Sequence, residues 1–277
     1  MSEPTYSDSP ALVKAIYQEF RRHFAQAERK RRWSIDDDIP WDQCNPQLNP
    51  AVADVVESFC AVEMYLPDYT GKIMPWIRAN RGRAWFTANW GYEEAKHSLS
   101  LGDWLLKSGQ RTEEQMQDLE GEVFQHEWNL PMDDVRGMLV YSMTQELATW
   151  LNYRNLRQAV GPQGDPALYK LLGYIMVDER AHYDFFLRVA RLHLEDDRAG
   201  TLEQLRRVLN NFAMPAIHML ADGRQRIANV KSLHIFDDEI FYKDVYLPIL
   251  HDLGVSRAEL RRKTAREVVV VSPPANP

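Results

Sequence analysis

The chain has 277 residues, of which 45% are hydrophobic and 26% charged, as is typical of a globular protein, and its formal net charge is −7. The acidic balance argues against nucleic acid as a main partner, and the two cysteines, Cys44 and Cys60, exclude a disulfide framework or a four-cysteine metal site. No apolar run approaches the roughly 18 residues of a membrane span, and the polar N-terminus lacks the apolar core of a signal peptide, so we expect a cytoplasmic location.

The first third of the chain is predicted to contain two helices separated by a loop. Residues 1–9 are polar, and we expect them to be loose. Apolar residues recur every three to four positions over 11–32, which predicts a helix. Prolines and aspartates over 33–50 predict an extended loop, and a second helix is predicted over about 50–66. The residues that predict a kink or a break after this helix are Pro67, Gly71 and Pro75.

Four more helices are predicted in the middle of the chain. The first covers about 83–107 and ends at a serine-glycine pair. A crossover helix over 112–128, with Thr112 as its N-cap, lets the next pair run in the required directions. The last two cover about 132–160 and 165–195 and are separated by a turn that begins with Gly-Pro.

The C-terminal part is predicted to be helical as well. Helices are expected over 201–221, 237–253 and 256–267, followed by a loose tail over 272–277. No segment shows the alternation and turn residues of a β-hairpin. We therefore predict an all-α fold.

Four of the predicted helices place ionisable residues on a face that is otherwise apolar. At residues 94–97 and 179–182 the motif Glu-x-x-His falls within an apolar stripe, so that a carboxylate and an imidazole point toward the core. The helices over 50–66 and 132–160 each place a single glutamate in the same way. Because burying such groups without a partner is costly, the pattern predicts bound cations. The six inward-facing residues are Glu63, Glu94, His97, Glu146, Glu179 and His182.

This pattern is typical of a ferritin-like four-helix bundle with a di-iron or di-manganese centre. Four carboxylates offset two divalent cations, and hard oxygen ligands favour iron or manganese over copper or zinc. Fourteen residues separate Glu146 from Val160 and Asp165 from Glu179, so both helices rise about 21 Å and the two glutamates meet at one level. Because the six residues must share one core, we predict a single domain over 1–277, with additional helices flanking the bundle.

Several short motifs follow one another along the chain. They are Glu63-Met64-Tyr65-Leu66-Pro67-Asp68-Tyr69, Trp85-Phe86-Thr87, Glu93-Glu94-Ala95-Lys96-His97, Glu146-Leu147-Ala148-Thr149, Asp178-Glu179-Arg180-Ala181-His182, and Met214-Pro215-Ala216 with Asp222-Gly223-Arg224. Together they resemble, in order, the motifs of the soluble acyl-acyl carrier protein desaturases. The resemblance extends over about residues 10 to 255.

The resemblance implies a ligand set and a set of partners. It implies that Glu94 and Glu179 bridge two irons, that Glu63 and Glu146 are terminal ligands, and that His97 and His182 each bind one iron. It places Thr149 beside the oxygen-binding face, and it assigns Trp33, at the surface, and Asp178 to the route of the electrons. It further implies O₂ as co-substrate, a substrate bound to acyl carrier protein, a ferredoxin-type electron donor and a homodimer.

Three functions are compatible with the sequence. The favoured one is an enzyme that inserts a cis double bond into a carrier-bound fatty acyl chain. A second is hydroxylation or N-oxygenation of a carrier-bound biosynthetic intermediate, which the departures Ala95-Lys96 and Arg180-Ala181 keep open. Iron storage is disfavoured, because a minimal storage bundle does not need the helices beyond Gly200. Thr149, three residues after a ligand glutamate, favours the alkene over oxygen insertion.

Several residues have alternative structural roles. The alternative for Thr149 is a hydrogen bond to the carbonyl group four residues back, and the alternative for Trp33 is to pin its loop. The basic segment over 21–32 is either a solvated helix face or a docking patch for an acidic partner. If it is a docking patch, we expect Arg29–Arg32 to bind an acidic acyl carrier protein. The residues expected to pack or to lie at the surface are His126, His193, His218, His234, His251, Trp85, Trp90 and Trp150.

Overall fold

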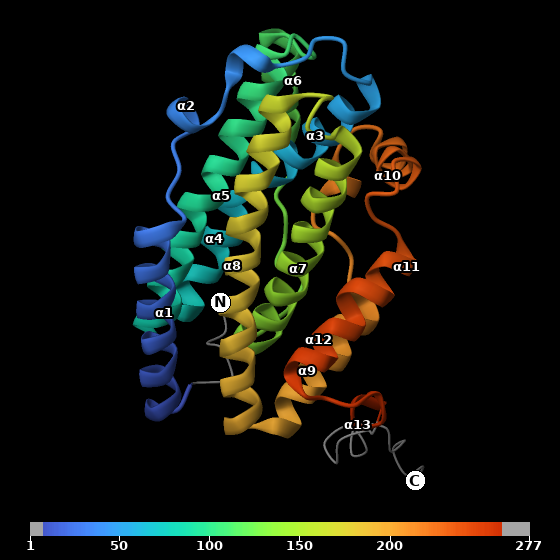
Figure 1. Ribbon diagram of the computed structural model, residues 1–277. Coiled ribbons are helices and arrows are strands. Elements are labelled where there is room, and N and C mark those ends of the chain that lie inside the picture. The colour runs from blue at the N-terminus through green and yellow to red at the C-terminus, as the bar shows by residue number, and fades with distance from the viewer. Residues whose placement is uncertain (1–7, 262–277) are drawn as a thin grey trace.

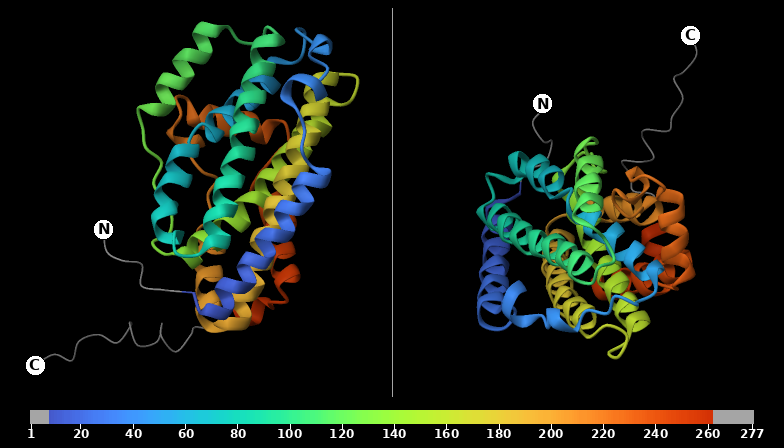
Figure 2. Two further views of the ribbon diagram at one scale, coloured as in Figure 1. Left: turned by 90° about the vertical axis from the view of Figure 1, so that its left-hand side faces the viewer. Right: turned by 90° about the horizontal axis from the view of Figure 1, so that it is seen from above.

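The computed structural model describes residues 8–261, and all regular structure in this part of the chain is helical. The predicted all-α fold is confirmed. The helices that carry the six inward-facing residues are α3 (Pro50–Glu63), α5 (Arg81–Lys107), α7 (Val135–Val160) and α8 (Pro166–Asp196) (Figure 1). α1 (Pro10–Lys30) packs along α5 and α8, and α4 (Leu66–Ile77) packs against α5, as the two views of Figure 2 show.

Side-chain caps fix where the bundle helices begin. Asn80 accepts a hydrogen bond from the third amide of α5, Asp134 does the same for α7 and Asp165 for α8. α6 (Glu113–Phe124) begins at the predicted cap Thr112, which forms a capping box. These side chains satisfy amide groups that the first helical turn leaves unpaired.

Asp165 also ties three segments together. Its carboxylate accepts hydrogen bonds from the amide of Asn45 at 2.8 Å and from the indole of Trp104 at 3.0 Å. Trp104 is fully buried in α5. One capping residue therefore sets the start of α8, the position of α5 and the course of the preceding loop.

The C-terminal ends of the helices agree in part with the ends predicted from the sequence. α5 and α7 end at glycines, as predicted: Gly109 has φ 72° and Gly161 has φ 68°, values that favour glycine. The predicted loop over 33–50 contains two short helices, α2 (Ile35–Asp38) and η1 (Trp41–Gln43).

The break after the first bundle helix comes earlier than expected. α3 ends at Glu63 and the chain turns at residues 64–65, whereas the helix was expected to reach about residue 66 and the break to fall between Pro67 and Pro75. Pro67 lies in the first turn of α4, where its missing amide hydrogen leaves no hydrogen bond unmade. Pro75 lies inside the same helix, close to its end.

The C-terminal third differs from the prediction. α9 (Arg198–Asn211) ends well before residue 221, and an irregular segment over 212–222 follows. Pro215 accounts for the difference, because proline supplies no helical N–H and disfavours helix in the residue before it. The segment contains one 3₁₀ turn, η2 (Ile217–Met219), and leads into α10 (Gly223–Ser232), which the sequence analysis missed.

The last described helices pack against α7, α8 and α9. They are α11 (Asp238–Ile240), the π-helical η3 (Phe241–Tyr246), α12 (Leu247–Leu253) and α13 (Arg257–Arg261). Residues 262–267 of the predicted last helix, the tail over 272–277 and residues 1–7 lie outside the described part of the chain, so a single domain over 1–277 stays a prediction. Within residues 8–261, no helix combines the length and the apolar character that crossing a membrane requires.

Candidate metal centre

The six inward-facing residues come together inside the bundle. Their ligand atoms form two groups of four, and within each group the atoms lie within 4.8 Å of one another. Glu94 and Glu179 belong to both groups, Glu63 and His97 to one, and Glu146 and His182 to the other. Two adjacent clusters that share a pair of carboxylates have the arrangement that a two-metal centre requires.

The atoms of the cluster converge without satisfying one another. All six side chains are buried, and Nδ1 of His182 lies 3.2 Å from carboxylate oxygens of both Glu94 and Glu146. One carboxylate oxygen each of Glu94, Glu146 and Glu179, and Nδ1 of His97, have no hydrogen-bond partner among residues 8–261. Buried, unpaired anionic atoms that face one another are the atoms a cation would satisfy. The donor set therefore fits two divalent metal ions.

In the absence of metal the cluster holds protons. Burial and neighbouring carboxylates raise the pKa values of Glu94 and Glu146 well above their usual range. Burial acts in the same direction on Glu179, but the imidazoles of His182 and His97 beside its carboxylate outweigh it and lower its pKa to about 2. Metal binding would displace the protons on Glu94 and Glu146.

Each histidine turns its other ring nitrogen toward a second carboxylate. Nε2 of His97 lies 3.4 Å from Asp178, and Nε2 of His182 lies 2.7 Å from Glu93. These two carboxylates directly precede the shared glutamates, so α5 and α8 each orient the other's histidine. Such contacts fix the orientation of an imidazole and make it a better metal ligand. The sequence analysis missed Glu93, for which the repeated pair of adjacent acidic residues was the available signal.

The predicted docking patch is wrong at Arg31 and Arg32, which point inward. Arg31 donates to Asp178 at 2.6 Å and lies 3.4 Å from Glu93, and Arg32 donates to Glu93 at 2.6 Å. The two acidic side chains behind the histidines are buried and need counter-charges, which these guanidinium groups supply. The basic residues of the segment over 21–32 that are exposed are Arg21, Arg22, Arg29 and Lys30.

Trp33 is buried, so its expected place at the surface was wrong. Its indole donates to Asp178 at 2.8 Å, its ring stacks on Tyr174 at 5.3 Å between centroids, and the ammonium group of Lys96 lies 4.0 Å from the centre of its ring. The same carboxylate oxygen of Asp178 faces Nε2 of His97. A continuous chain of contacts therefore joins Trp33 to the cluster.

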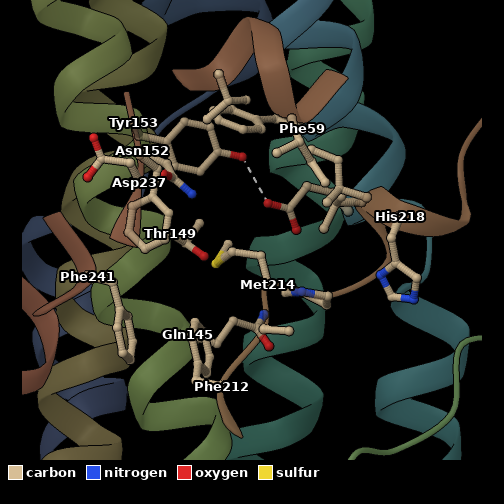
Figure 3. A pocket seen from close by; sticks show the side chains of 18 of the residues that line it. Phe59, Gln145, Thr149, Asn152, Tyr153, Phe212, Met214, His218, Asp237 and Phe241 are labelled. Atoms are coloured by element: carbon tan, nitrogen blue, oxygen red, sulfur yellow. Dashed lines mark hydrogen bonds between the residues drawn. The ribbon is translucent and has the colours of Figure 1, made fainter. Parts of the chain in front are cut away.

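A cavity of about 450 Å³ reaches Glu63 and Glu94 from one side. Figure 3 shows Thr149 directed into it, and Tyr153 donating to Glu63, a bond of 2.9 Å. No hydrogen bond of the Thr149 hydroxyl is found among the described residues, so the alternative bond to the carbonyl of residue 145 is not formed. The apolar part of the wall includes Phe59, Val62, Met214, Ile227, Val230 and Phe241.

The remaining histidines and tryptophans mostly have the expected structural roles. Trp90 and His193 are buried and Trp150 is half-buried. Trp85 was expected in the core and is instead 52% exposed. The exposed histidines are His126, His218, His234 and His251.

Comparison with known proteins places this site in a family. Residues 51–261 match the family model described as fatty acid desaturase. The chain belongs to this family. Over 194 residues it is 28% identical to stearoyl-[acyl-carrier-protein] 9-desaturase 2, chloroplastic, of Arabidopsis thaliana, which covers 68% of this chain and 41% of that protein. Over 220 residues it is 23% identical to DesA1 of Mycobacterium tuberculosis, covering 76% of this chain and 63% of DesA1.

This chain, a member of the desaturase family, therefore spans less than two thirds of the length of these two relatives. Solved structures agree on its fold. The X-ray structure of DesA2 from Mycobacterium tuberculosis H37Rv superposes with a TM-score of 0.71 at 16% identity, covering 90% of this chain and 97% of DesA2. An R2-like ligand-binding oxidase with a Mn/Fe cofactor gives a TM-score of 0.55 at 15% identity, covering 91% of this chain and 100% of that one. The predicted ferritin-like bundle is confirmed.

We expect Glu94→Ala or Glu179→Ala to lose most of both metal ions, because each variant removes an anion that two close cations share. Elemental analysis of the iron-loaded protein should give about two metal ions per chain for the unaltered protein. Glu114→Ala, at an exposed position of α6, is the matched control and should keep the full content. Full metal content in either cluster variant would overturn the assignment of shared ligands.

Removing the metal should lower the melting temperature, because the carboxylates then face one another without cations. The expected drop is on the order of 5 °C or more, since a domain of this size shifts by roughly 2–4 °C per kcal/mol. The raised pKa values of Glu94 and Glu146 stabilise the metal-free protein below the ordinary glutamate pKa, and this contribution is lost as pH rises. Calorimetry of chelated and loaded protein should therefore show a gap that widens between pH 5 and 8. Equal melting temperatures of the chelated and the loaded protein at neutral pH would contradict the burial of the cluster.

Proposed function

We propose that the protein is an O₂-dependent di-iron oxidoreductase that inserts a cis double bond into an acyl chain bound to acyl carrier protein. The observation that carries the proposal is the pair of clusters that share Glu94 and Glu179 at the end of a largely apolar cavity. The plant relative is named a stearoyl-[acyl-carrier-protein] 9-desaturase, and this name supports a carrier-bound acyl chain as the substrate class.

The overall reaction balances with one O₂ and two external electrons. The acyl chain loses two hydrogen atoms from neighbouring methylenes, which form the alkene. O₂ takes up these two hydrogens, two protons and two electrons and leaves as two water molecules. We infer that a ferredoxin-type protein supplies the two electrons.

The side chains of the cluster would hold the irons, with Glu94 and Glu179 shared between them. Bound iron would supply the capacity to reduce O₂ and to oxidise an unactivated methylene. The apolar cavity wall would hold the chain and exclude water from the reacting carbon atoms. Thr149, which lies in the cavity with its hydroxyl unpaired, would position a polar group beside the reacting chain.

Electrons would reach the cluster through Trp33, Asp178 and His97. The three side chains are linked by contacts of 2.8 and 3.4 Å. Trp33 is itself covered by Tyr174 and Lys96, so the donor would dock over these two side chains rather than on the indole.

Oxygen insertion by the same cluster is the second candidate. Asn152 and Gln145 add polar groups to the cavity, and such groups suit a substrate that is not a plain alkyl chain. Iron storage is less well supported, because the cluster faces a largely apolar cavity lined by the segment over 212–222 and by α10.

The reaction is tested by turnover with ¹⁸O₂, reduced ferredoxin and stearoyl-acyl carrier protein, followed by mass spectrometry of the released acyl group. We expect a product lighter by two hydrogens and free of ¹⁸O, since Thr149 lines the cavity beside the cluster, as in the desaturase-like arrangement. A product that carries ¹⁸O would reject desaturation and establish oxygen insertion.

We also propose that the protein forms a homodimer through α5. This helix exposes large apolar side chains at intervals of seven residues, with small residues between them on the same edge. The pattern is self-complementary, because an antiparallel second copy of α5 brings large side chains beside small ones. The large residues are Trp85, Tyr92, Leu99 and Leu106, and the small ones are Ala88, Ala95 and Gly102.

Leu99→Glu should weaken the dimer by roughly 100-fold, because two copies would each bury an unpaired carboxylate. Sedimentation equilibrium measures the dissociation constant. Phe124→Glu makes the same type of change at a comparably exposed residue on α6 and should leave the dimer intact. An unaltered protein that sediments as a monomer, or a Leu99→Glu variant that stays dimeric, would refute this interface.

A further inference from the structure

We propose that the acyl chain bound in the cavity carries a hydrogen-bonding polar group, a hydroxyl or a secondary amide, that pairs with Asn152. The inference rests on the proposed function, since it takes the cavity beside the cluster as the substrate site. Asn152 lines this cavity and is only 4% exposed. Its side-chain oxygen has no hydrogen-bond partner among residues 8–261. Figure 3 shows its amide group directed into the cavity.

The unpaired amide oxygen of Asn152 is unfavourable where it lies. Removing such a group from water without pairing it costs free energy, and native structures rarely leave one unpaired. The neighbouring hydroxyl of Tyr153 donates to Glu63. The oxygen itself is enclosed by protein atoms, but Figure 3 shows the nitrogen of the same amide directed into the cavity. No residue among 8–261 accepts a hydrogen bond from this nitrogen, so the partner it can take is a molecule that fills the cavity.

Asn152 is part of a polar edge of α7. Gln145, Thr149 and Asn152 follow at intervals of four and three residues, which places them on one face of the helix. All three line the cavity, while α3, α10 and the segment over 212–222 supply mainly apolar side chains. The cavity therefore has a polar edge on α7 and a mainly apolar wall elsewhere, with further polar groups at Lys231, Asp237 and Asp238, and its ligand is expected to match both.

A plain alkyl chain matches the apolar wall but leaves the polar edge on α7 without a partner. It would displace water from Asn152 and offer no hydrogen bond in return. A site that hydrogen-bonds a polar substrate group discriminates strongly against the analogue that lacks it. A chain with a hydroxyl or an amide satisfies the side chain, because both groups can accept a hydrogen bond from the amide nitrogen that faces the cavity.

The position of Asn152 places the polar group near the carbon atoms that react. Asn152 lies six residues beyond Glu146 and three beyond Thr149, which correspond to about 9 Å and about 4.5 Å along the helix axis. The polar group would therefore lie within a short stretch of chain from the oxidised position.

Binding of matched probes to the full-length, iron-loaded protein tests the inference. The probes are dodecanoyl-pantetheine, a series of its mid-chain hydroxy isomers, and an analogue in which a secondary amide replaces two mid-chain methylenes. Isothermal titration should show at least one polar probe bound about 10- to 100-fold more tightly than the alkyl probe. The hydroxy and amide arms tell which of the two groups the site takes.

Asn152→Leu has nearly the same shape and should abolish or reverse this preference by tightening the alkyl probe and weakening the polar one. Its ligand-free melting temperature should be unchanged or higher, since the amide it removes is unpaired. Asn152→Ser keeps a hydrogen-bonding group and should retain part of the preference. Asn211→Leu makes the same chemical change on α9, outside this cavity, and is the control.

An alkyl probe that binds the unaltered protein as tightly as every polar probe would overturn the inference, as would an Asn152→Leu variant with the preference intact. The proposed function is judged separately by turnover. If the alkyl probe is bound and oxidised while no polar probe binds better, the function stands and this inference fails. If polar probes bind better but no acyl chain is oxidised, the inference stands and the function fails.

Discussion

Charge balance inside the bundle is the constraint on which the rest of the structure depends. Four ligand carboxylates are buried together with two more, Glu93 and Asp178, which lie behind the histidines. Arg31 and Arg32 supply two positive charges at this outer pair. The four remaining carboxylates match two divalent cations. Without metal, protons on Glu94 and Glu146 relieve the repulsion, and two bound cations would replace these protons and complete the charge balance.

The outer pair also shows why α1 belongs to the site although it carries no metal ligand. Its C-terminal end delivers Arg31, which contacts carboxylates from both α5 and α8. Those carboxylates orient the histidines of the opposite helix, so that displacing either helix would disturb both imidazoles. The following residues bring Trp33 to the same Asp178. The orientation of the histidines and the proposed electron route thus depend on one set of contacts.

The convergence of the six inward-facing residues was predictable from the sequence, and their surroundings were not. Glutamate and histidine in an otherwise apolar helical stripe indicate bound metal because burying them without a cation is so costly, and helix caps such as Asp165 are local signals. Arg31 and Arg32 look like a solvated basic run unless their partners, some sixty to one hundred and fifty residues away, are known. The segment over 212–222 was predicted as helix because its apolar spacing masked the effect of Pro215. Tertiary contacts decided the placement of both arginines, which no local pattern encodes.

The chemistry of the site depends on the α7 side of the cavity more than on the ligands. The same ligand set can support loss of a second hydrogen or return of oxygen to carbon, so the ligands do not select the product. What differs between the two outcomes is where the chain lies relative to the oxidant. Glu93 and Asp178, behind the histidines, are paired with arginines, whereas the side chains of Thr149 and Asn152 line the cavity without a hydrogen-bond partner among residues 8–261. These two side chains are therefore the part of the site that can still respond to the substrate, and they are the part that would set its position.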